Sequence, residues 1–302
     1  VLYEKNADSR SLIASTTKIM TALVICEQCN VLDRVQIMPE AVGIEGSSMY
    51  LQAGEVLTVQ ELLYGLMLQS GNDAAVALAI YCGGTVEGFA QLMNDEARRI
   101  GLTGTHFENP NGLDHENHYS TARDLAKLTA YAMENEIFAK TVSTKSIQVG
   151  GRSLTNHNKL LWRYEGADGV KTGYTKAAGR ILVSSATRDG LTLIAVVLGS
   201  PSSADRFHSA TTLLDYGFAN YAAAPLPALP ERPLALAVKG SAEDSVPLDY
   251  AALPETILIE KGTASALRAE LTLPEALEAP VEKGRTVGKV SIFQDDTLLN
   301  EY

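Results

Sequence analysis

Apolar residues are grouped along the chain in runs that predict helices first and strands later. Residues 19–26 are apolar nearly all round, which is typical of a helix buried on every side. The capping box Thr58-Val59-Gln60-Glu61 precedes a second apolar run at residues 62–68, and a third covers residues 74–81. These patterns predict three core helices, with the polar turn Ser70-Gly71-Asn72 between the second and the third.

A second group of runs alternates as strands do. Residues 180–187 and 191–198 flank Asp189-Gly190, which predicts a β-hairpin. Residues 170–175 predict a third antiparallel strand, and we expect residues 1–5 to add another. A long helix is predicted at residues 204–221.

The composition changes at residues 222–230, where several prolines mark a boundary. Residues 231–302 are short strand-like runs broken by glycine and proline. We therefore expect two domains: an α+β domain over residues 1–221 and a small all-β domain over residues 222–302.

Charge and cysteine content narrow the function classes. A net charge of −11 on 302 residues argues against a nucleic-acid partner and gives no polybasic membrane patch. The chain has no apolar run of about eighteen residues and no leader, so we expect a trimmed or mature form. Cys26-x-x-Cys29 lacks a second ligand pair and His115-x-x-His118 lacks helical spacing, so no metal site is predicted.

The chemistry is organised around Ser15 and Lys18, which stand in an S-x-x-K pattern. If a helix begins here, residues three apart share one face, so the lysine lies beside the serine hydroxyl. A lysine whose pKa is lowered by burial or by a second cation removes the proton from such a hydroxyl. The free N–H groups at the start of a helix also suit an oxyanion. Because the helix that follows is buried, a solvated lysine is the weaker interpretation.

Two further motifs supply partners for that pair. Ser70-Gly71-Asn72 carries a hydroxyl and an amide on a turn between two core helices, where polar groups need partners. Lys171-Thr172-Gly173 lies on a predicted strand, and a glycine there allows close backbone approach. Arg206 lies in the first turn of a predicted helix, where a cation opposes the helix dipole, which hints at a functional role.

In chain order, S-x-x-K, S-G-N and K-T-G resemble the motif set of the low-molecular-mass penicillin-binding proteins, the serine D-alanyl-D-alanine carboxypeptidase family. The segments around the motifs and residues 118–125 agree with that family, and the C-terminal module is similar to the one that follows its catalytic domain. The resemblance covers nearly the whole chain. It implies an α+β fold: a β-lactamase/penicillin-binding-like transpeptidase domain, with an antiparallel sheet flanked by helices plus a helical subdomain, followed by a small all-β domain.

The resemblance implies a role for each motif residue and no cofactor. Ser15 attacks the carbonyl between the terminal D-alanines of a peptidoglycan stem peptide, with Lys18 as general base, held partly neutral beside Lys171. The backbone N–H groups of Ser15 and Tyr174 form the oxyanion hole, and β-lactams acylate the same serine. The other implied roles are proton relay by Ser70, orientation of Lys18 and the peptide amide by Asn72, binding of the terminal carboxylate by Lys171, Thr172 and Arg206, and a place near the site for His157.

Other activities remain open at this point. A β-lactamase needs a glutamate in an E-x-x-x-N loop, and neither Glu134 nor Glu165 fits that pattern. A D,D-endopeptidase of the same family differs in its leaving group. An inactive peptidoglycan-binding or sensor protein has no need of the intact serine and lysines. The family also implies an extracytoplasmic location reached through a signal peptide absent from this chain, with membrane association only through segments absent from it.

Overall fold

The computed structural model describes residues 1–302 apart from the side chain of Ser265, and the chain forms two compact units. The first comprises Val1–Arg188 and Thr192–Gly217, and the second comprises Asp189–Leu191 and Phe218–Tyr302. Each unit has a hydrophobic core of its own.

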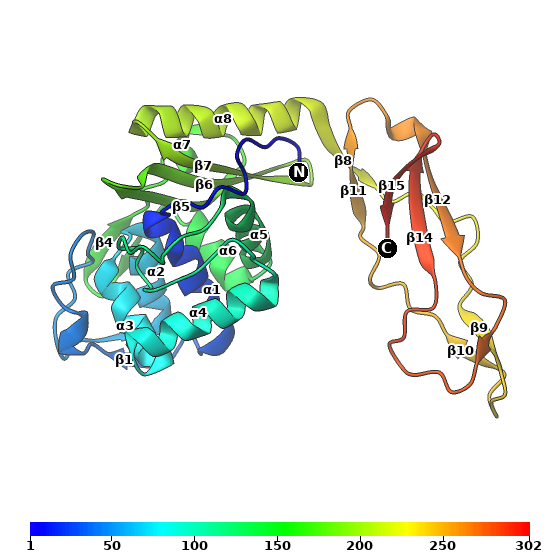
Figure 1. Ribbon diagram of the computed structural model, residues 1–302, viewed down its shortest axis with the longest axis horizontal. Helices are drawn as coiled ribbons and strands as arrows, with labels where there is room; N and C mark the ends of the chain where they lie inside the picture. The colour runs from blue at the N-terminus through cyan, green and yellow to red at the C-terminus, as the bar shows by residue number, and fades with distance from the viewer. The chain divides into compact units, whose positions relative to one another are not determined.

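A three-stranded sheet is the framework of the first unit. Its strands are β5 (Ala167–Thr175), β6 (Gly179–Arg188) and β7 (Leu191–Ser200), in the order β5-β6-β7. The helix α8 (Ser203–Asn220) covers one face of this sheet and the remaining longer helices lie on the other (Figure 1). The order leaves β5 at an edge of the sheet, where it contacts the turn that carries Ser15.

The Asp-Gly hairpin predicted from the sequence is confirmed. Asp189 and Gly190 have φ of 48° and 78°, the two positive values that a type I′ turn requires. The expected fourth strand is wrong, because residues 1–5 form no strand and Ser11 makes only an isolated bridge with Ser120. Val1 and Tyr3 are 92% and 59% exposed, so this segment is not packed against the sheet.

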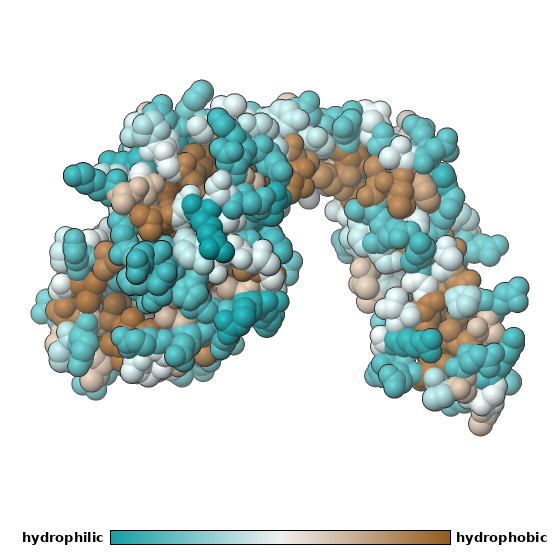
Figure 2. Space-filling view, in the orientation of Figure 1, coloured by the Kyte–Doolittle hydropathy of each residue, from teal (hydrophilic) through white to brown (hydrophobic). Residues whose placement is uncertain are grey.

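The helical part of the first unit is built around α1 (Lys18–Gln28), which contacts all the helices from α2 to α6. Its residues from Ile19 to Ile25 are buried, which confirms the all-round apolar pattern. Figure 2 shows hydrophilic side chains over α4, on the side turned away from this core. The other helices are α2 (Val59–Leu68), α3 (Asn72–Gly83), α4 (Val86–Ile100), α5 (Ala122–Met133), α6 (Glu136–Ser143) and the short α7 (Leu160–Arg163).

Two small antiparallel ladders border the helices. The first joins β1 (Arg34–Gln36) to β2 (Val56–Thr58), and the second is the hairpin of β3 (Ser146–Val149) and β4 (Arg152–Thr155). Among the described residues, no single helix is long and apolar enough to cross a membrane. Only α3 and α4 reach that length as a pair, and they are bent by 82° where they meet.

The second unit is all-β, as the sequence predicts. Its core is formed by small and aliphatic side chains such as Ala224, Ile257 and Ile292. Two ladders contribute to that core: β8 (Tyr221–Pro225) with β11 (Thr256–Glu260), and β14 (Lys289–Gln294) with β12 (Leu267–Thr272) and β15 (Thr297–Glu301). A third ladder, of β9 (Ala235–Lys239) with β10 (Ser245–Pro247) and β13 (Leu277–Glu278), buries Leu236 and Leu277 outside it.

Candidate active site

Ser15 lies on a 3-10 turn, η1 (Ala14–Thr17), that leads directly into α1. The turn is closed by Thr16 Oγ1, which donates a hydrogen bond of 2.5 Å to the carbonyl oxygen of Ile13. Residues three apart are stacked along such a turn. Ser15 and Lys18 therefore lie one above the other as predicted, although the α-helix begins at the lysine and not at the serine.

Lys18 is completely buried and has three polar neighbours. Its Nζ lies 3.0 Å from Ser15 Oγ, 2.7 Å from Asn72 Oδ1 and 2.6 Å from the carbonyl oxygen of Asn111. Two of these neighbours only accept hydrogen bonds, while the serine hydroxyl also donates. An ammonium group can donate to all three oxygens, and a neutral amine, with two N–H donors and one lone pair, can donate to two of them and accept the serine proton, so the contacts fit both states.

Of these two states, the electrostatic surroundings favour the neutral one. The pKa of Lys18 is lowered well below its usual value, chiefly by burial and then by the positive charge of Lys171, against the opposing effect of Asp73. Burial, followed by the charge of Arg206, lowers the pKa of Lys171 to about 7. Both causes that the sequence suggested for an activated lysine are therefore present.

The S-G-N motif lies on the turn between α2 and α3. Ser70 is buried with φ of 60°, a left-handed conformation that non-glycine residues rarely adopt. Asn72 is the first residue of α3, and its Nδ2 donates to the carbonyl oxygen of Glu45 while its Oδ1 accepts from Lys18. The asparagine is thus fixed from both ends of its amide group.

The K-T-G motif lies on the edge strand β5, whose neighbour η1 carries the serine. Lys171 is buried and donates to the carbonyl oxygen of Thr172 at 2.9 Å. A Cβ on Gly173 would lie 3.2 Å from the carbonyl oxygen of Ile13 and 3.3 Å from the backbone nitrogen of Ser15. The glycine therefore permits the serine turn itself to lie against the strand, a reason the sequence did not reveal.

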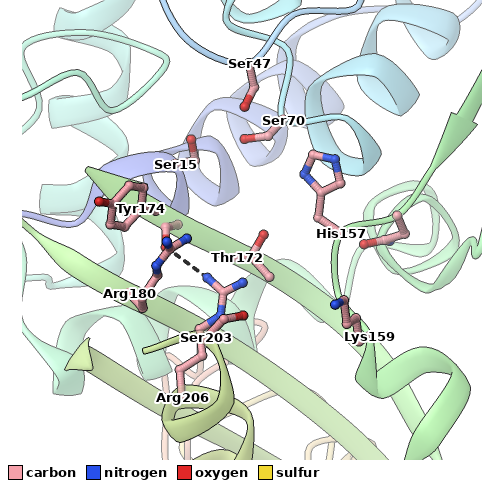
Figure 3. A pocket seen from close by; sticks show the side chains of 12 residues that line it. Ser15, Ser47, Ser70, His157, Lys159, Thr172, Tyr174, Arg180, Ser203 and Arg206 are labelled. Carbon is pink, nitrogen blue, oxygen red and sulfur yellow. Dashed lines mark hydrogen bonds between the residues drawn. The ribbon is translucent and has the colours of Figure 1, made fainter. Parts of the chain in front are cut away.

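A cavity of about 460 Å³ opens above these motifs. In Figure 3, Ser15 and Ser70 lie on one side of it, with Thr172 and Arg206 on the other and His157 at one end. Burial, and then the charges of Lys171 and Arg206, lower the pKa of His157. Of the predicted site residues, the cavity brings together Ser15, Ser70, His157, Thr172, Gly173, Tyr174 and Arg206, while Lys18, Asn72 and Lys171 are buried beside it.

Arg206 reaches the cavity from α8, where the sequence suggested a functional cation. Its Nη1 donates to the carbonyl oxygens of Gly173 and Ile181, at 3.1 and 3.2 Å. These bonds hold the guanidinium group against the strand that carries the K-T-G motif.

The loop before α5 supports Ser15 and Lys18, a role that the sequence did not reveal. Besides the carbonyl of Asn111, it provides Gly112, whose φ is 87° and whose Cβ, if present, would lie 1.9 Å from the carbonyl oxygen of Ala14. His118 Nδ1 accepts from the backbone N–H of Glu108, so its Nε2 donates to Thr17 Oγ1 at 2.7 Å. The succession Pro110-Asn111-Gly112 in a long polar stretch was the available signal.

Asp73 is a second supporting residue that the sequence did not single out. Its buried carboxylate accepts hydrogen bonds from Ser48 Oγ and from the backbone N–H groups of Met49 and Leu51. Since Ser47 lines the cavity, this carboxylate fixes the loop that forms one wall.

Comparison with known proteins identifies the family. Residues 1–202 match the peptidase S11 family, described as D-alanyl-D-alanine carboxypeptidase, and residues 234–302 match the family described as penicillin-binding protein 5, C-terminal domain. The chain belongs to the D-alanyl-D-alanine carboxypeptidase family. The C-terminal match falls within the second, all-β unit.

Relatives of this carboxypeptidase agree along nearly its whole length. It is 35% identical to the D-alanyl-D-alanine carboxypeptidase DacF of Bacillus subtilis over 100% of this chain and 80% of the relative. It is also 35% identical to DacC of Escherichia coli, over 96% of this chain and 76% of the relative.

Solved structures confirm the expected fold of the carboxypeptidase. Penicillin-binding protein 5 from Haemophilus influenzae superposes with a TM-score of 0.85 at 34% identity, covering 99% of this chain and 90% of that one. The Streptomyces K15 DD-transpeptidase superposes with a TM-score of 0.69 at 41% identity, covering 72% of this chain and 92% of that one. The predicted serine D,D-carboxypeptidase function is likewise confirmed, and the β-lactamase, endopeptidase and inactive alternatives are not favoured.

Proposed function

We propose that this carboxypeptidase removes the terminal D-alanine from peptidoglycan stem peptides through an acyl-enzyme on Ser15. The observation that carries the proposal is the 3.0 Å separation of Ser15 Oγ and the Nζ of a completely buried Lys18. Lys18, neutral for the reasons given above, takes the hydroxyl proton as Ser15 Oγ attacks the carbonyl carbon.

The charge that develops on the carbonyl oxygen needs two preorganised donors. The backbone N–H groups of Ser15 and Tyr174 serve this purpose, since η1 and β5 lie in contact. Because Gly173 has no side chain, these two backbone segments can lie close together.

Proton transfer to the leaving D-alanine completes acylation. Ser70 faces the cavity and carries the proton to the leaving amine, which breaks the peptide bond. Asn72 orients both Lys18 and the amide of the peptide. Water then attacks the acyl-serine and releases the shortened peptide.

The carboxylate of the terminal D-alanine is held at the other side of the cavity. Thr172 supplies a hydroxyl, and Lys171 and Arg206 supply positive charge. His157, whose lowered pKa favours the neutral ring at pH 7, lines the same cavity and offers a hydrogen bond to the peptide.

Because a β-lactam presents a strained amide and a carboxylate in similar positions, we propose that it acylates Ser15 as well. The stem-peptide substrate places the reaction outside the cytoplasm. No metal or cofactor takes part in this mechanism.

Intact-protein mass spectrometry after exposure to benzylpenicillin tests the mechanism. We expect an adduct of one penicillin on the native chain and none on Ser15→Ala. Release of D-alanine from a pentapeptide, measured in parallel, separates carboxypeptidase from endopeptidase action. Absence of both adduct and D-alanine release in the native chain would overturn the proposal.

A further inference from the structure

A second arginine, Arg180, faces the carboxylate end of the cavity. It lies near the start of β6, directly opposite Tyr174 of β5 in the antiparallel register. Residues opposite each other in this way present their side chains on the same face of the sheet. Figure 3 shows Arg180 and Arg206 at the same end of the cavity, beside Tyr174 and Thr172.

Arg180 is held by an aromatic ring. Its Cζ lies 3.7 Å from the centroid of the Tyr174 ring, within the range of a cation–π contact. Such a contact orients the guanidinium group without neutralising its charge or occupying its N–H donors. Arg180 is therefore preorganised and still able to bind an anion.

Arg206 also has binding capacity left. The residue lines the cavity although it is only 8% exposed, and its two hydrogen bonds to the strands use Nη1 alone. Burial and the nearby charge of Arg180 both lower its pKa, which means that the two cations repel each other. Among the described residues, no aspartate or glutamate lines this cavity to offset that repulsion.

We propose that Arg180 and Arg206 together bind the carboxylate of the substrate, which makes Arg180 a specificity-determining residue for free-acid C-termini. An anion between the two guanidinium groups relieves their repulsion and accepts charge-assisted hydrogen bonds from them. This inference rests on the proposed function for the identity of the anion. It predicts discrimination against peptides whose terminal carboxylate is amidated.

A binding cycle tests the inference without turnover. In a Ser15→Ala background, isothermal titration calorimetry measures the Kd of an N-acetylated peptide ending in D-Ala-D-Ala, as the free acid and as the C-terminal amide. We expect Arg180→Met to weaken binding of the free acid about tenfold, the size of one charge-assisted hydrogen bond, and binding of the amide less than twofold. Arg180→Lys keeps the charge and is expected to lose less.

The same strand offers a matched control. Arg188 lies near the end of β6, and its Cζ is 4.4 Å from the centroid of the Tyr164 ring, but it does not line the cavity. Arg188→Met removes the same stacked side chain and is expected to leave both Kd values unchanged.

Three results would overturn the inference. They are equal weakening of both peptides by Arg180→Met, no weakening of either, and no preference for the free acid when Arg180 is intact. Circular dichroism melting of each variant identifies a folding defect. If Arg180→Met has one, the Kd values of Arg180→Lys are compared with those of the native side chain instead. The proposed function is tested by a separate measurement, the release of D-alanine by the chain with Ser15 intact. Absence of that release would contradict the proposed function and not the inference about Arg180.

Discussion

Ser15 Oγ and Lys18 Nζ lie 3.0 Å apart, and the lysine has no exposed surface. An ammonium group in such a place loses its hydration and has no carboxylate as a hydrogen-bond partner, because its other two neighbours are the uncharged oxygens of Asn72 and Asn111. The arrangement therefore favours the amine, and the amine is the form that activates the serine.

Removing the base leaves the serine in place but unactivated. We expect Lys18→Met to lower the rate constant for Ser15 acylation by benzylpenicillin by about 10²–10⁴-fold, the usual contribution of general base catalysis. Lys18→Arg introduces a permanent positive charge, retains N–H donors and cannot be deprotonated at ordinary pH. Time-resolved intact mass measures both rates. Rapid acylation of Lys18→Arg would show that charge, and not proton transfer, is what Lys18 supplies.

The charge of Lys171 sets the pH range in which Lys18 is neutral. Because that charge lowers the pKa of Lys18, we expect Lys171→Met to raise it and to move the rising limb of the acylation profile to higher pH. Acylation rates from pH 5 to 10 measure the shift. Lys127→Met removes a lysine that caps the carbonyl of Gly101 and is the control, with no shift expected. A limb that stays in place in Lys171→Met would contradict the coupling.

Gly112 tests the fit between the supporting loop and the serine turn. A Cβ there would lie 1.9 Å from the carbonyl oxygen of Ala14, so Gly112→Ala must displace η1. We expect the acylation rate to fall at least tenfold because Ser15 is displaced. The positive φ of the alanine separately lowers the stability by roughly 1–2 kcal/mol. Gly43 also has positive φ, at 72°, but open space around it, so Gly43→Ala isolates the backbone cost. Equal acylation rates in the two variants would exclude a role for the loop in placing Ser15.

His118 links stability to pH. Burial, followed by the charges of His106, His115 and Lys18, lowers the pKa of His118 from 6.5 to about 4. Between these values the unfolded chain binds a proton at this residue and the folded chain does not, so stability falls as the pH drops from 6.5 to 4. At 1.36 kcal/mol per pKa unit, the loss is roughly 3 kcal/mol when complete.

The variant His118→Gln retains a donor toward Thr17 and does not titrate. At pH 7 we expect the variant to have a smaller free energy of unfolding than the native chain. This difference between the two proteins is expected to narrow by pH 4.5, because only the native chain loses the contribution of His118. Urea unfolding at the two pH values measures it. A difference that stays constant would show that His118 is protonated equally in the folded and unfolded states.

Local sequence determined most of the elements and the identity of the motif residues. The apolar run after Lys18 predicts a buried helix because no polar face is left for solvent. The Asp189-Gly190 pair predicts its hairpin because both residues tolerate the positive φ that the turn needs. The spacing of Ser15 and Lys18 brings them together because residues three apart are stacked in a 3-10 turn as well as adjacent in an α-helix.

The tertiary structure decided which distant groups complete the site. The carbonyl of Asn111 contacts Lys18 at a sequence separation of 93, and no local pattern encodes such a contact. The same is true of Arg180, whose place beside the carboxylate end follows from the register of β5 against β6. Periodicity and caps act over a few residues, so sequence alone determined the secondary-structure elements and the motif residues. Packing between segments far apart in the chain determined that Lys18 is buried away from water and that two arginines face one cavity.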